Sequence, residues 1–437
     1  MYNHCSYPCN DPNIPSVNLQ IDKEDFVCDW GSFTQCYLII AWAPPGTEAS
    51  VFDVKSAFRI VPTLPSDRPQ LMISWRDKVY FDNVFSFGAT SAPGVFGRIA
   101  DLFVLLLKKG FSIQDILKWV DDFVFFRYPR TPIIGAVQYD YDERLFINFA
   151  RELGWTWEMD KHTKFSRLFT YLGFDWDLGV KTVTLPEKKK IKYVRKLQTW
   201  LAEGRVTLRR KDVDNVAGTL NHCALVVPQG RSRLVSIYKY LASFRNASND
   251  FVKFPIPITA LQDVAWWKQE LSAPIVTLQI REPPPLNADE IYVDASTSWG
   301  IGLVYRGRWL AWRFKAGWRL EGRNIGWGEM VAVELALRTI LASSLSNVHL
   351  TLRSDNQGVI GALAAGRSYG VQENIILQHI LHLFHKHKIW FTIRYIPSKE
   401  NPADAPSRGI LPHRSKMYPY QPRTPTHLKE LLNIVLG

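Results

Sequence analysis

Short runs of β-branched and aromatic residues alternate with amphipathic stretches from Val51 onward. The run Val51–Phe58 predicts a strand that ends in a turn, and Ser91–Lys108 has the spacing of a helix with Pro93 near its start. Ile116–Phe126 is strongly apolar on both sides of two adjacent acids, which predicts a hairpin with the turn Val120-Asp121-Asp122. Further elements expected before residue 180 are a helix at Leu145–Leu153 and paired short strands at Trp155–Trp157 and Phe169–Trp176.

The rest of the chain divides into a helical part and a second strand-rich part. Pro186–Arg245 is mostly helical in pattern, and Trp266 and Trp267 lie on a further expected helix. Pro283-Pro284-Pro285 is a semi-rigid spacer, so we expect a domain boundary there. The order of elements predicts mixed α+β structure first and an α/β unit afterwards. Expected after the spacer are strands at Glu290–Asp294, Gly300–Tyr305, Trp309–Phe314, Val348–Ser354 and Ile389–Ile396, helices at Gly328–Leu341, Gly358–Leu363 and Glu373–His385, and a short amphipathic helix near Leu428–Leu436.

The chain of 437 residues is too long for one ordinary core, and its formal charge of +12 is unevenly distributed. Lys181–Arg245 holds 15 Lys and Arg against 4 Asp and Glu, a surplus of 11. A solvated helix surface would normally interleave acids, so this surplus favours a face that binds nucleic acid. The candidate nucleic-acid-binding residues are Lys188, Lys189, Lys190, Arg209, Arg210, Lys211, Arg231 and Arg233.

Cysteine usage and hydropathy indicate a cytoplasmic or nuclear protein. The five cysteines form no plausible disulfide framework, which suits a reducing compartment. His4, Cys5 and Cys9 lie close together, yet the chain has no C-x-x-C pair that would support zinc. The longest apolar run, Leu102–Leu107, is far too short for a membrane span, and no signal peptide is visible, so no membrane partner is expected.

The first set of candidate catalytic residues is Asp53 with Asp121 and Asp122. An acidic pair between apolar runs is either a turn tip or a metal site, and the pair alone leaves both alternatives open. Two divalent ions about 4 Å apart can activate an attacking hydroxyl and clamp a leaving phosphate, and their ligands must approach from neighbouring strands. A strand-end Asp53 beside a tight acidic hairpin supplies such ligands, so we expect two Mg²⁺ or Mn²⁺ ions here.

The second set is Asp294, Glu329, Asp355 and Asp404. Asp294 and Asp355 each follow a predicted strand and Glu329 begins a predicted helix, so a second site for two Mg²⁺ or Mn²⁺ ions is expected. Glu334 is a rival of Glu329, but five positions separate them, and one helix face cannot point both at one centre. Glu334 is therefore expected to be a surface acid.

Five motifs in order resemble those of reverse transcriptases. Asp53 through Phe58 resembles the first palm motif, Phe87-Gly88-Ala89-Thr90-Ser91-Ala92-Pro93-Gly94-Val95-Phe96 the second, and Trp119-Val120-Asp121-Asp122 the third, with Trp119 in place of the usual Tyr. Lys161 after Leu153-Gly154 is similar to the fourth motif. Tyr171-Leu172-Gly173-Phe174 resembles the primer grip. The resemblance implies that Phe58, Gly88 and Lys161 contact the incoming nucleotide, with Phe58 excluding a 2′-hydroxyl, and that Tyr171, Leu172 and Gly173 hold the primer.

Two later segments extend the resemblance to retroelements. Val216-Ala-Gly-Thr-Leu-Asn-His resembles the thumb and connection of DIRS-like and related retrotransposon polymerases. Residues 287–409, closing on Asn-Pro-Ala-Asp-Ala-Pro-Ser-Arg, resemble retroelement ribonuclease H domains. The resemblance implies an α+β right-hand polymerase followed by an α/β ribonuclease H-like domain. The implied domains are partial fingers at 1–50, palm and fingers at 51–180, a basic thumb, connection and linker at 181–286, ribonuclease H at 287–409, and a Pro-rich basic tail at 410–437.

These resemblances imply a reverse transcriptase with linked ribonuclease H activity. Its partners would be an RNA template, a DNA primer, the RNA–DNA hybrid and deoxynucleoside triphosphates, together with other products of a polyprotein. Lys23 is the only Lys or Arg among the first 50 residues, so either the basic side chains that grip the triphosphate lie upstream of Met1 in a longer polyprotein or the element has decayed. Two alternatives stay open: a retroelement-derived nucleic-acid-binding protein that no longer polymerises, and a nuclease alone.

Overall fold

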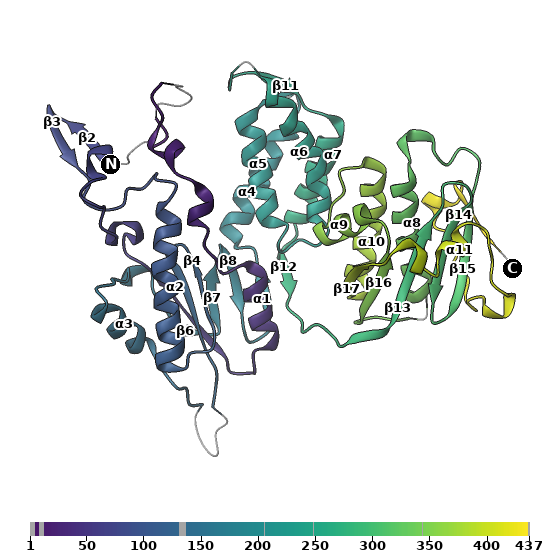
Figure 1. Ribbon diagram of the computed structural model, residues 1–437, viewed down its shortest axis with the longest axis horizontal. Coiled ribbons are helices and arrows are strands. Elements are labelled where there is room, and N and C mark those ends of the chain that lie inside the picture. Colours follow the sequence, from purple (N-terminus) through teal and green to yellow (C-terminus); the bar gives the residue numbers. More distant parts are fainter. Residues whose placement is uncertain are drawn as a thin grey trace. The chain divides into compact units, whose positions relative to one another are not determined.

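The computed structural model describes residues 5–7, 13–130, 137–204, 206–247, 249–342 and 344–435. The chain forms two compact units: unit 1 is Met1–Pro186 with Thr277–Glu282, and unit 2 is Glu187–Val276 with Pro283–Gly437 (Figure 1). His4 and Cys9, considered above as zinc ligands, lie outside the described residues. Within the described ranges, every helix is too short or too polar to cross a membrane.

Unit 1 is built on a four-stranded sheet with the order β4-β5-β1-β6. Phe52, Phe123 and Phe125 project from one face of this sheet into a core that contains aromatic residues of helices α2 and α3. Asp53 and Asp122 alternate with these rings and so belong to the other face. The elements are β1 (Glu48–Asp53), α2 (Ala92–Phe111), β4 (Ile116–Trp119), β5 (Asp122–Arg127), α3 (Glu143–Glu152) and β6 (Thr163–Ser166).

A second sheet has the order β12-β9-β8-β7 and contacts the face of the first sheet that carries Asp53 and Asp122. The Phe126 ring of β5 meets the Phe169 ring of β7 edge to face, with centroids 5.8 Å apart. Helix α1 begins at a capping box formed by Ser32 and Gln35. The remaining elements of unit 1 are α1 (Phe33–Trp42), β7 (Leu168–Tyr171), β8 (Phe174–Asp177), β9 (Thr182–Thr184) and β12 (Thr277–Gln279). Strands β2 (Met72–Trp75) and β3 (Lys78–Phe81) form a separate hairpin.

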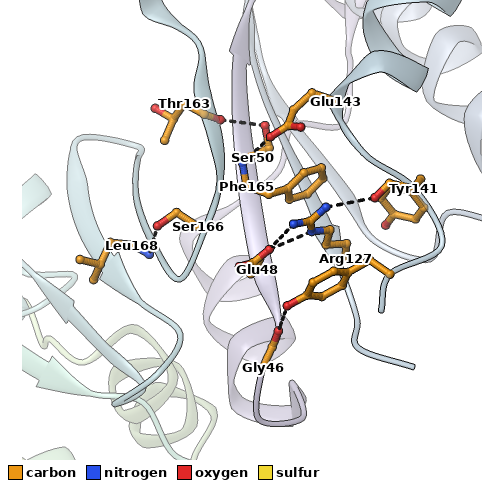
Figure 2. A network of polar contacts seen from close by, with 11 residues as sticks. Gly46, Glu48, Ser50, Arg127, Tyr141, Glu143, Thr163, Phe165, Ser166 and Leu168 are labelled. Atoms are coloured by element: carbon orange, nitrogen blue, oxygen red, sulfur yellow. Dashed lines mark hydrogen bonds and ion pairs between the residues drawn. The ribbon is translucent and has the colours of Figure 1, made fainter. Parts of the chain in front are cut away.

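The end of the β1–β5 ladder that lies away from the acids is held by opposite charges. Glu48 stands directly opposite Arg127, whose Nε donates to the Glu48 carboxylate at 2.9 Å. The Arg127 guanidinium also lies over the Tyr139 and Phe165 rings, at 3.9 and 4.2 Å from their centroids. Figure 2 shows this network across β1, β5 and β6. It fixes the strand register, and therefore fixes which residues face each other at the far end.

Unit 2 combines a helical part with a six-stranded mixed sheet of the order β17-β16-β13-β14-β15-β18. Strands β13, β16 and β17 run parallel to one another, whereas β14 is antiparallel to β13, β15 to β14 and β18 to β15. Helix α8 packs into the core of this sheet along nearly its whole length. The helical elements are α4 (Glu187–Trp200), α5 (Arg210–Cys223), α6 (Val235–Ala242), α7 (Ile258–Leu271), α8 (Ile325–Leu341), α9 (Gln357–Ala365), α10 (Val371–His387) and α11 (Asp404–Ser407). The strands are β10 (Thr207–Arg209), β11 (Lys253–Pro255), β13 (Leu286–Ala295), β14 (Gly300–Tyr305), β15 (Arg308–Phe314), β16 (His349–Ser354), β17 (Trp390–Tyr395) and β18 (Leu432–Ile434).

Most of the predicted elements are confirmed within a few residues, and two predictions are wrong. Trp157 forms only an isolated bridge to Val54, while Phe169–Trp176 forms its own hairpin around Leu172 and Gly173, both at positive φ. Near the C-terminus, Leu432–Ile434 is a strand on β15 and not a helix. In both cases a short apolar run has no period of its own, and the available partner strand decided its structure.

Candidate metal centres

The first acid group comprises Asp53, Asp121 and Asp122. Each contributes a carboxylate oxygen to a set whose members lie within 4.8 Å of one another. Asp53 ends β1 and is the direct partner of Asp122 at the start of β5. Val120 takes φ +53° in the turn, and the Val54 N–H donates to the Asp121 carbonyl at 2.8 Å. The hairpin thus brings together three acids that are separated by about 70 residues in the chain.

Like charges directly opposite each other in a ladder are destabilising, so this end of the strand pair requires a cation. Lys161 supplies one, with Nζ 3.0 Å from both oxygens of Asp53. A 3-10 helix at Met159–Lys161 positions it, because the Glu158 N–H donates to the Asp53 carbonyl at 2.8 Å. One ammonium against three carboxylates still leaves two negative charges, which suits divalent ions.

The pKa shifts of the first acid group also indicate a site for divalent ions. Burial, followed by repulsion from Asp121 and Asp53, raises the pKa of Asp122 to about 6. Burial and the Asp53 charge also raise the pKa of Asp121, while Lys161 opposes both shifts. These carboxylates are therefore crowded and undercompensated. Oxygen-only donors with this charge are what Mg²⁺ and Mn²⁺ prefer, so the residues fit the expected ions.

Phe58 and Gly88 are the other residues predicted to contact the incoming nucleotide. The Phe58 ring packs against Phe87 and Phe96, with centroids 5.4 and 5.9 Å away, and stays partly exposed. Gly88 has φ +115°, which a residue with a side chain rarely adopts. Asn18, which no sequence motif indicated, donates to the Gly88 carbonyl at 2.8 Å and accepts from the Thr90 N–H at 2.8 Å.

The predicted primer-grip residues form the tip of the β7–β8 hairpin. Tyr171 is only 2% exposed, and its hydroxyl donates to the Gly31 carbonyl at 3.1 Å. Tyr171 therefore supports the turn from the interior and is wrong as a residue whose ring contacts a primer. Leu172 and Gly173 are the partly exposed residues of this turn. Trp119, 43% exposed beside the acidic hairpin, offers an aromatic surface there.

The second acid group comprises Asp294, Glu329 and Asp355, whose carboxylate oxygens also lie within 4.8 Å of one another. Asp294 is near the end of β13 and Asp355 directly follows β16. These two strands are parallel neighbours, so their carboxyl ends meet at one edge of the sheet. Glu329 reaches the same edge from α8, which begins after the N-cap Asn324. Asp294 and Glu329 are each 4% exposed.

Glu329 is the most strongly perturbed acid of this group. Burial, then the charges of Asp294 and Asp355, raises the pKa of Glu329 to about 9. Its Oε2 atom is buried and has no hydrogen-bond partner among the described residues. Burial also raises the pKa of Asp294 to about 6. An orphaned carboxylate oxygen beside two other carboxylates fits a divalent cation, which would both pair with it and restore its charge.

The segment Asn401–Arg408 is fastened to the sheet beside this group. Asn401 Nδ2 donates to the Val293 carbonyl at 2.9 Å, and the hydroxyl of the fully buried Ser407 donates to Asp294. A Cβ on Gly302 would lie 2.3 Å from the Ala403 carbonyl oxygen, so only glycine lets this segment approach β14. No role was predicted for Asn401 or Ser407, although both belong to the motif Asn-Pro-Ala-Asp-Ala-Pro-Ser-Arg that resembles ribonuclease H domains.

Asp404 lies outside the second acid group. Its carboxylate pairs with Arg408 at 2.9 Å, and its charge contributes to the raised pKa of Asp294. Glu334, expected to be a surface acid, is fully buried, and that prediction is wrong. Arg338 compensates its charge at 2.7 Å, and Nε2 of His427 lies 3.0 Å from its other oxygen. The five-residue spacing does separate Glu329 from Glu334, as expected.

The predicted nucleic-acid-binding residues fall into two classes. Lys190 is buried and donates to the carbonyls of Ala273 and Pro274, so it is wrong as a surface contact. Arg233 is largely enclosed, pairs with Asp263 at 3.3 Å and lies over the Trp266 ring, which makes it structural as well. Lys189 is partly buried. Exposed residues are Lys188, Arg209, Arg210, Lys211 and Arg231.

A basic hollow of about 660 Å³ in unit 2 includes one of these residues. Arg367 lies between two aromatic rings, 5.7 Å from the centroids of Tyr238 and Tyr369. Of the residues that line the hollow within the described part of the chain, none is acidic. Arg367 lies far beyond the basic stretch Lys181–Arg245 and has no local sequence signal of its own. The basic lining residues are Arg210, Lys239, Arg245 and Arg367.

The raised pKa values of Asp294 and Glu329 predict that the metal-free protein loses stability as pH rises. Between pH 5 and 9 the folded state retains protons on Asp294 and Glu329 that the unfolded chain has already lost, so the free energy of unfolding falls with pH. At about 1.4 kcal/mol per pKa unit the total effect reaches several kcal/mol. We expect thermal melts in EDTA to show this decline, Mg²⁺ to diminish it, and Glu329→Gln to remove most of it above pH 6. A melting temperature independent of pH in EDTA would contradict the assignment.

Comparison with known proteins found similarity to solved structures and none at the level of sequence families. No protein family matches its sequence, and no curated protein matches it. Similar solved structures include foamy viral protease-reverse transcriptase dRH with double-stranded DNA (17% identity, TM-score 0.45, 87% of this chain and 62% of that chain). The foamy viral protease-reverse transcriptase with an RNA/DNA hybrid shows 16% identity and a TM-score of 0.45, over 92% of this chain and 49% of that chain. The foamy viral protease-reverse transcriptase with double-stranded DNA shows 16% identity and a TM-score of 0.43, over 85% of this chain and 71% of that chain. The chain thus spans about half to two thirds of the first two proteins it is similar to. The interpretation of the two centres rests on their own residues and geometry.

Proposed function

We propose that this chain is an RNA-directed DNA polymerase with linked ribonuclease H activity, of the kind encoded by DIRS-like and related retrotransposons. The observation that carries the proposal is the presence of two separate groups of three converging carboxylates, one in each unit. Each group contains acids whose pKa values are raised by burial and mutual repulsion. Two such centres in a strongly basic chain suit two reactions on phosphodiesters.

In the first centre, Asp53, Asp121 and Asp122 would hold two Mg²⁺ or Mn²⁺ ions. When bound, the ions would activate a primer 3′-hydroxyl and neutralise charge on the triphosphate of a deoxynucleotide. Lys161 pairs with Asp53, and with Asp53 engaged in holding an ion its ammonium would be available to the leaving phosphates. Leu172 and Gly173 would support the primer, and Trp119 would present a ring to its end. This assignment includes the palm at 51–180 of the proposed domain arrangement.

In the second centre, Asp294, Glu329 and Asp355 would hold the two ions that support hydrolysis of the RNA strand in a hybrid. Ser407 holds Asp294 in place through a hydrogen bond. Asp404 is outside the compact group and pairs with Arg408, so we assign it to the outer edge of the site, where its carboxylate would help to hold an ion. This centre belongs to the proposed ribonuclease H domain at 287–409.

The thumb and connection proposed for 181–286 would contact the hybrid through its backbone. Arg209, Arg210, Lys211 and Arg231 are exposed, and the Arg367 hollow adds stacked guanidinium and aromatic groups. Phosphate contacts of this kind position a duplex without reading its sequence. The RNA template, DNA primer and RNA–DNA hybrid are therefore the proposed partners.

Phe58→Val should relax discrimination against ribonucleotides. If the Phe58 ring lies under the sugar, a smaller side chain leaves room for a 2′-hydroxyl, and incorporation of a ribonucleotide relative to its deoxy form should rise roughly 10- to 100-fold. Single-nucleotide extension with paired ribo- and deoxynucleoside triphosphates measures this ratio. Phe87→Leu, which alters the neighbouring ring, serves as the control for general loosening. An unchanged ratio in an active Phe58→Val enzyme would remove Phe58 from the nucleotide site.

The proposed function is tested with the full chain, Mg²⁺ and two substrates: a DNA primer on an RNA template, and a preformed RNA–DNA hybrid. The double variant Asp121→Asn with Asp355→Asn is the inactive reference. Extension and cleavage by the wild type alone support the proposal. Cleavage without extension identifies a nuclease alone, and hybrid binding with neither reaction identifies a nucleic-acid-binding protein.

A further inference from the structure

A third group of metal-ligating side chains lies in unit 2, apart from the two acid groups. It comprises Glu334 of α8, His379 of α10 and His427 of the segment that precedes β18. Each offers one ligand atom, and these atoms lie within 4.8 Å of one another. Three segments that are distant in sequence therefore meet at two imidazoles and one carboxylate.

The carboxylate of this group is completely enclosed. Glu334 has no exposed surface, and such a charge is costly unless compensated. Arg338, one turn along α8, engages only Oε1, at 2.7 Å. The second oxygen, Oε2, lies 3.0 Å from Nε2 of His427. One carboxylate oxygen thus points toward the two histidines.

The two histidines lie face to face. The rings of His379 and His427 stack with centroids 4.0 Å apart and an angle of 13° between their planes. One ring nitrogen of each lies within 4.8 Å of the other and of a Glu334 carboxylate oxygen.

We propose that Glu334, His379 and His427 form a binding site for a zinc-type transition-metal ion that fastens the C-terminal segment to α8 and α10. Two imidazole nitrogens and one carboxylate oxygen are a common three-ligand set for Zn²⁺, with water in the fourth position. Imidazole donors also distinguish this site from the two acid groups, whose oxygen-only donors suit Mg²⁺ and Mn²⁺.

The lone pair of an imidazole nitrogen lies in the plane of its ring, so coordination of one ion by both histidines requires the rings to turn out of their stacked arrangement. Tetrahedral Zn²⁺ with ligand bonds of about 2.0–2.1 Å requires ligand atoms about 3.3 Å apart. Nε2 of His427 already meets Glu334 at 3.0 Å, and His427 is 28% exposed at its side chain, so rotation of the rings apart is sterically open. Arg338 keeps Oε1, which leaves Oε2 for the ion.

The site would stabilise the part of α8 that follows Glu329. Leu428, next to His427, is 1% exposed, and β18 pairs with β15, so the last segment is part of the core of unit 2. A metal ion between α8, α10 and this segment would add to the contact that His427 already makes with Glu334. The proposal does not depend on either proposed reaction.

The test is Zn²⁺ and Co²⁺ titration of the full chain in excess Mg²⁺, which keeps the acid groups occupied. We expect one tightly bound Zn²⁺ per chain, a visible Co²⁺ spectrum of tetrahedral type, and a rise in melting temperature with Zn²⁺. His379→Gln and His427→Gln should each weaken Zn²⁺ binding at least about 10-fold. His385→Gln, on the exposed part of the same helix, is the matched control and should bind as the wild type does.

Two results would overturn the proposal. One is tight Zn²⁺ binding that both histidine variants retain, which would place the ion elsewhere. The other is no stoichiometric Zn²⁺ binding by the wild type, with His427→Gln lowering the melting temperature equally with and without Zn²⁺; the group would then be an ion-pair network alone. Because Glu334 is buried, its substitution is not used, and the histidine variants keep the test independent of misfolding.

Discussion

Asp122→Asn should reduce RNA-templated primer extension by at least about 10³-fold while hybrid cleavage continues at the wild-type rate. Asp122 faces Asp53 across the β1–β5 ladder, so the amide removes one negative charge where two divalent ions are proposed to bind. Loss of several kcal/mol of metal-dependent stabilisation corresponds to a factor of this size, at tenfold per 1.4 kcal/mol. Single-turnover extension of a labelled primer measures the rate.

The same variant should be at least as stable as the wild type without metal. The carboxyl group of Asp122 has a pKa raised to about 6 by burial and by its acidic neighbours, and an amide avoids that repulsion. Asp160→Asn, an exposed acid beside Lys161, is the matched control and should leave extension unchanged. Full extension by Asp122→Asn would exclude the first acid group as the polymerase centre.

Asp355→Asn should have the converse effect, with hybrid cleavage reduced by about 10³-fold or more and primer extension retained. Asp355 follows β16 at the sheet edge where Asp294 and Glu329 converge, and it is the most exposed of the three. Its substitution therefore changes the charge of the site with the least disturbance to the core. Cleavage of a hybrid with labelled RNA, with extension measured on the same preparation, separates the two centres.

Asp289→Asn, in the same strand as Asp294 and paired with Arg306 at the surface, is the control for the second experiment. We expect it to cleave normally. Persistent cleavage by Asp355→Asn would show that the hydrolytic centre lies elsewhere. Equal loss of both reactions in either single variant would instead indicate that the two acid groups do not act separately.

The position of most elements could be predicted from the sequence because the signal is local. Pro93 marks the start of α2, and the apolar runs on each side of Asp121 are themselves the two strands of the hairpin. The short run at Leu432–Ile434 has no such signal. It is a strand because it pairs with β15, which lies more than 100 residues earlier in the chain. Lys190 was misassigned for a similar reason, because its carbonyl acceptors lie at Ala273 and Pro274.

The residue types available for metal chemistry, and their order after predicted strands and helices, can be read from the chain alone. Which acids converge depends on how the chain folds: Asp404 lies outside the second acid group, and Glu334 is buried in a cluster with His379 and His427. The physical reason is that strand pairing and helix packing set the direction of each side chain. Burial then sets its charge, and neither property is contained in the local pattern.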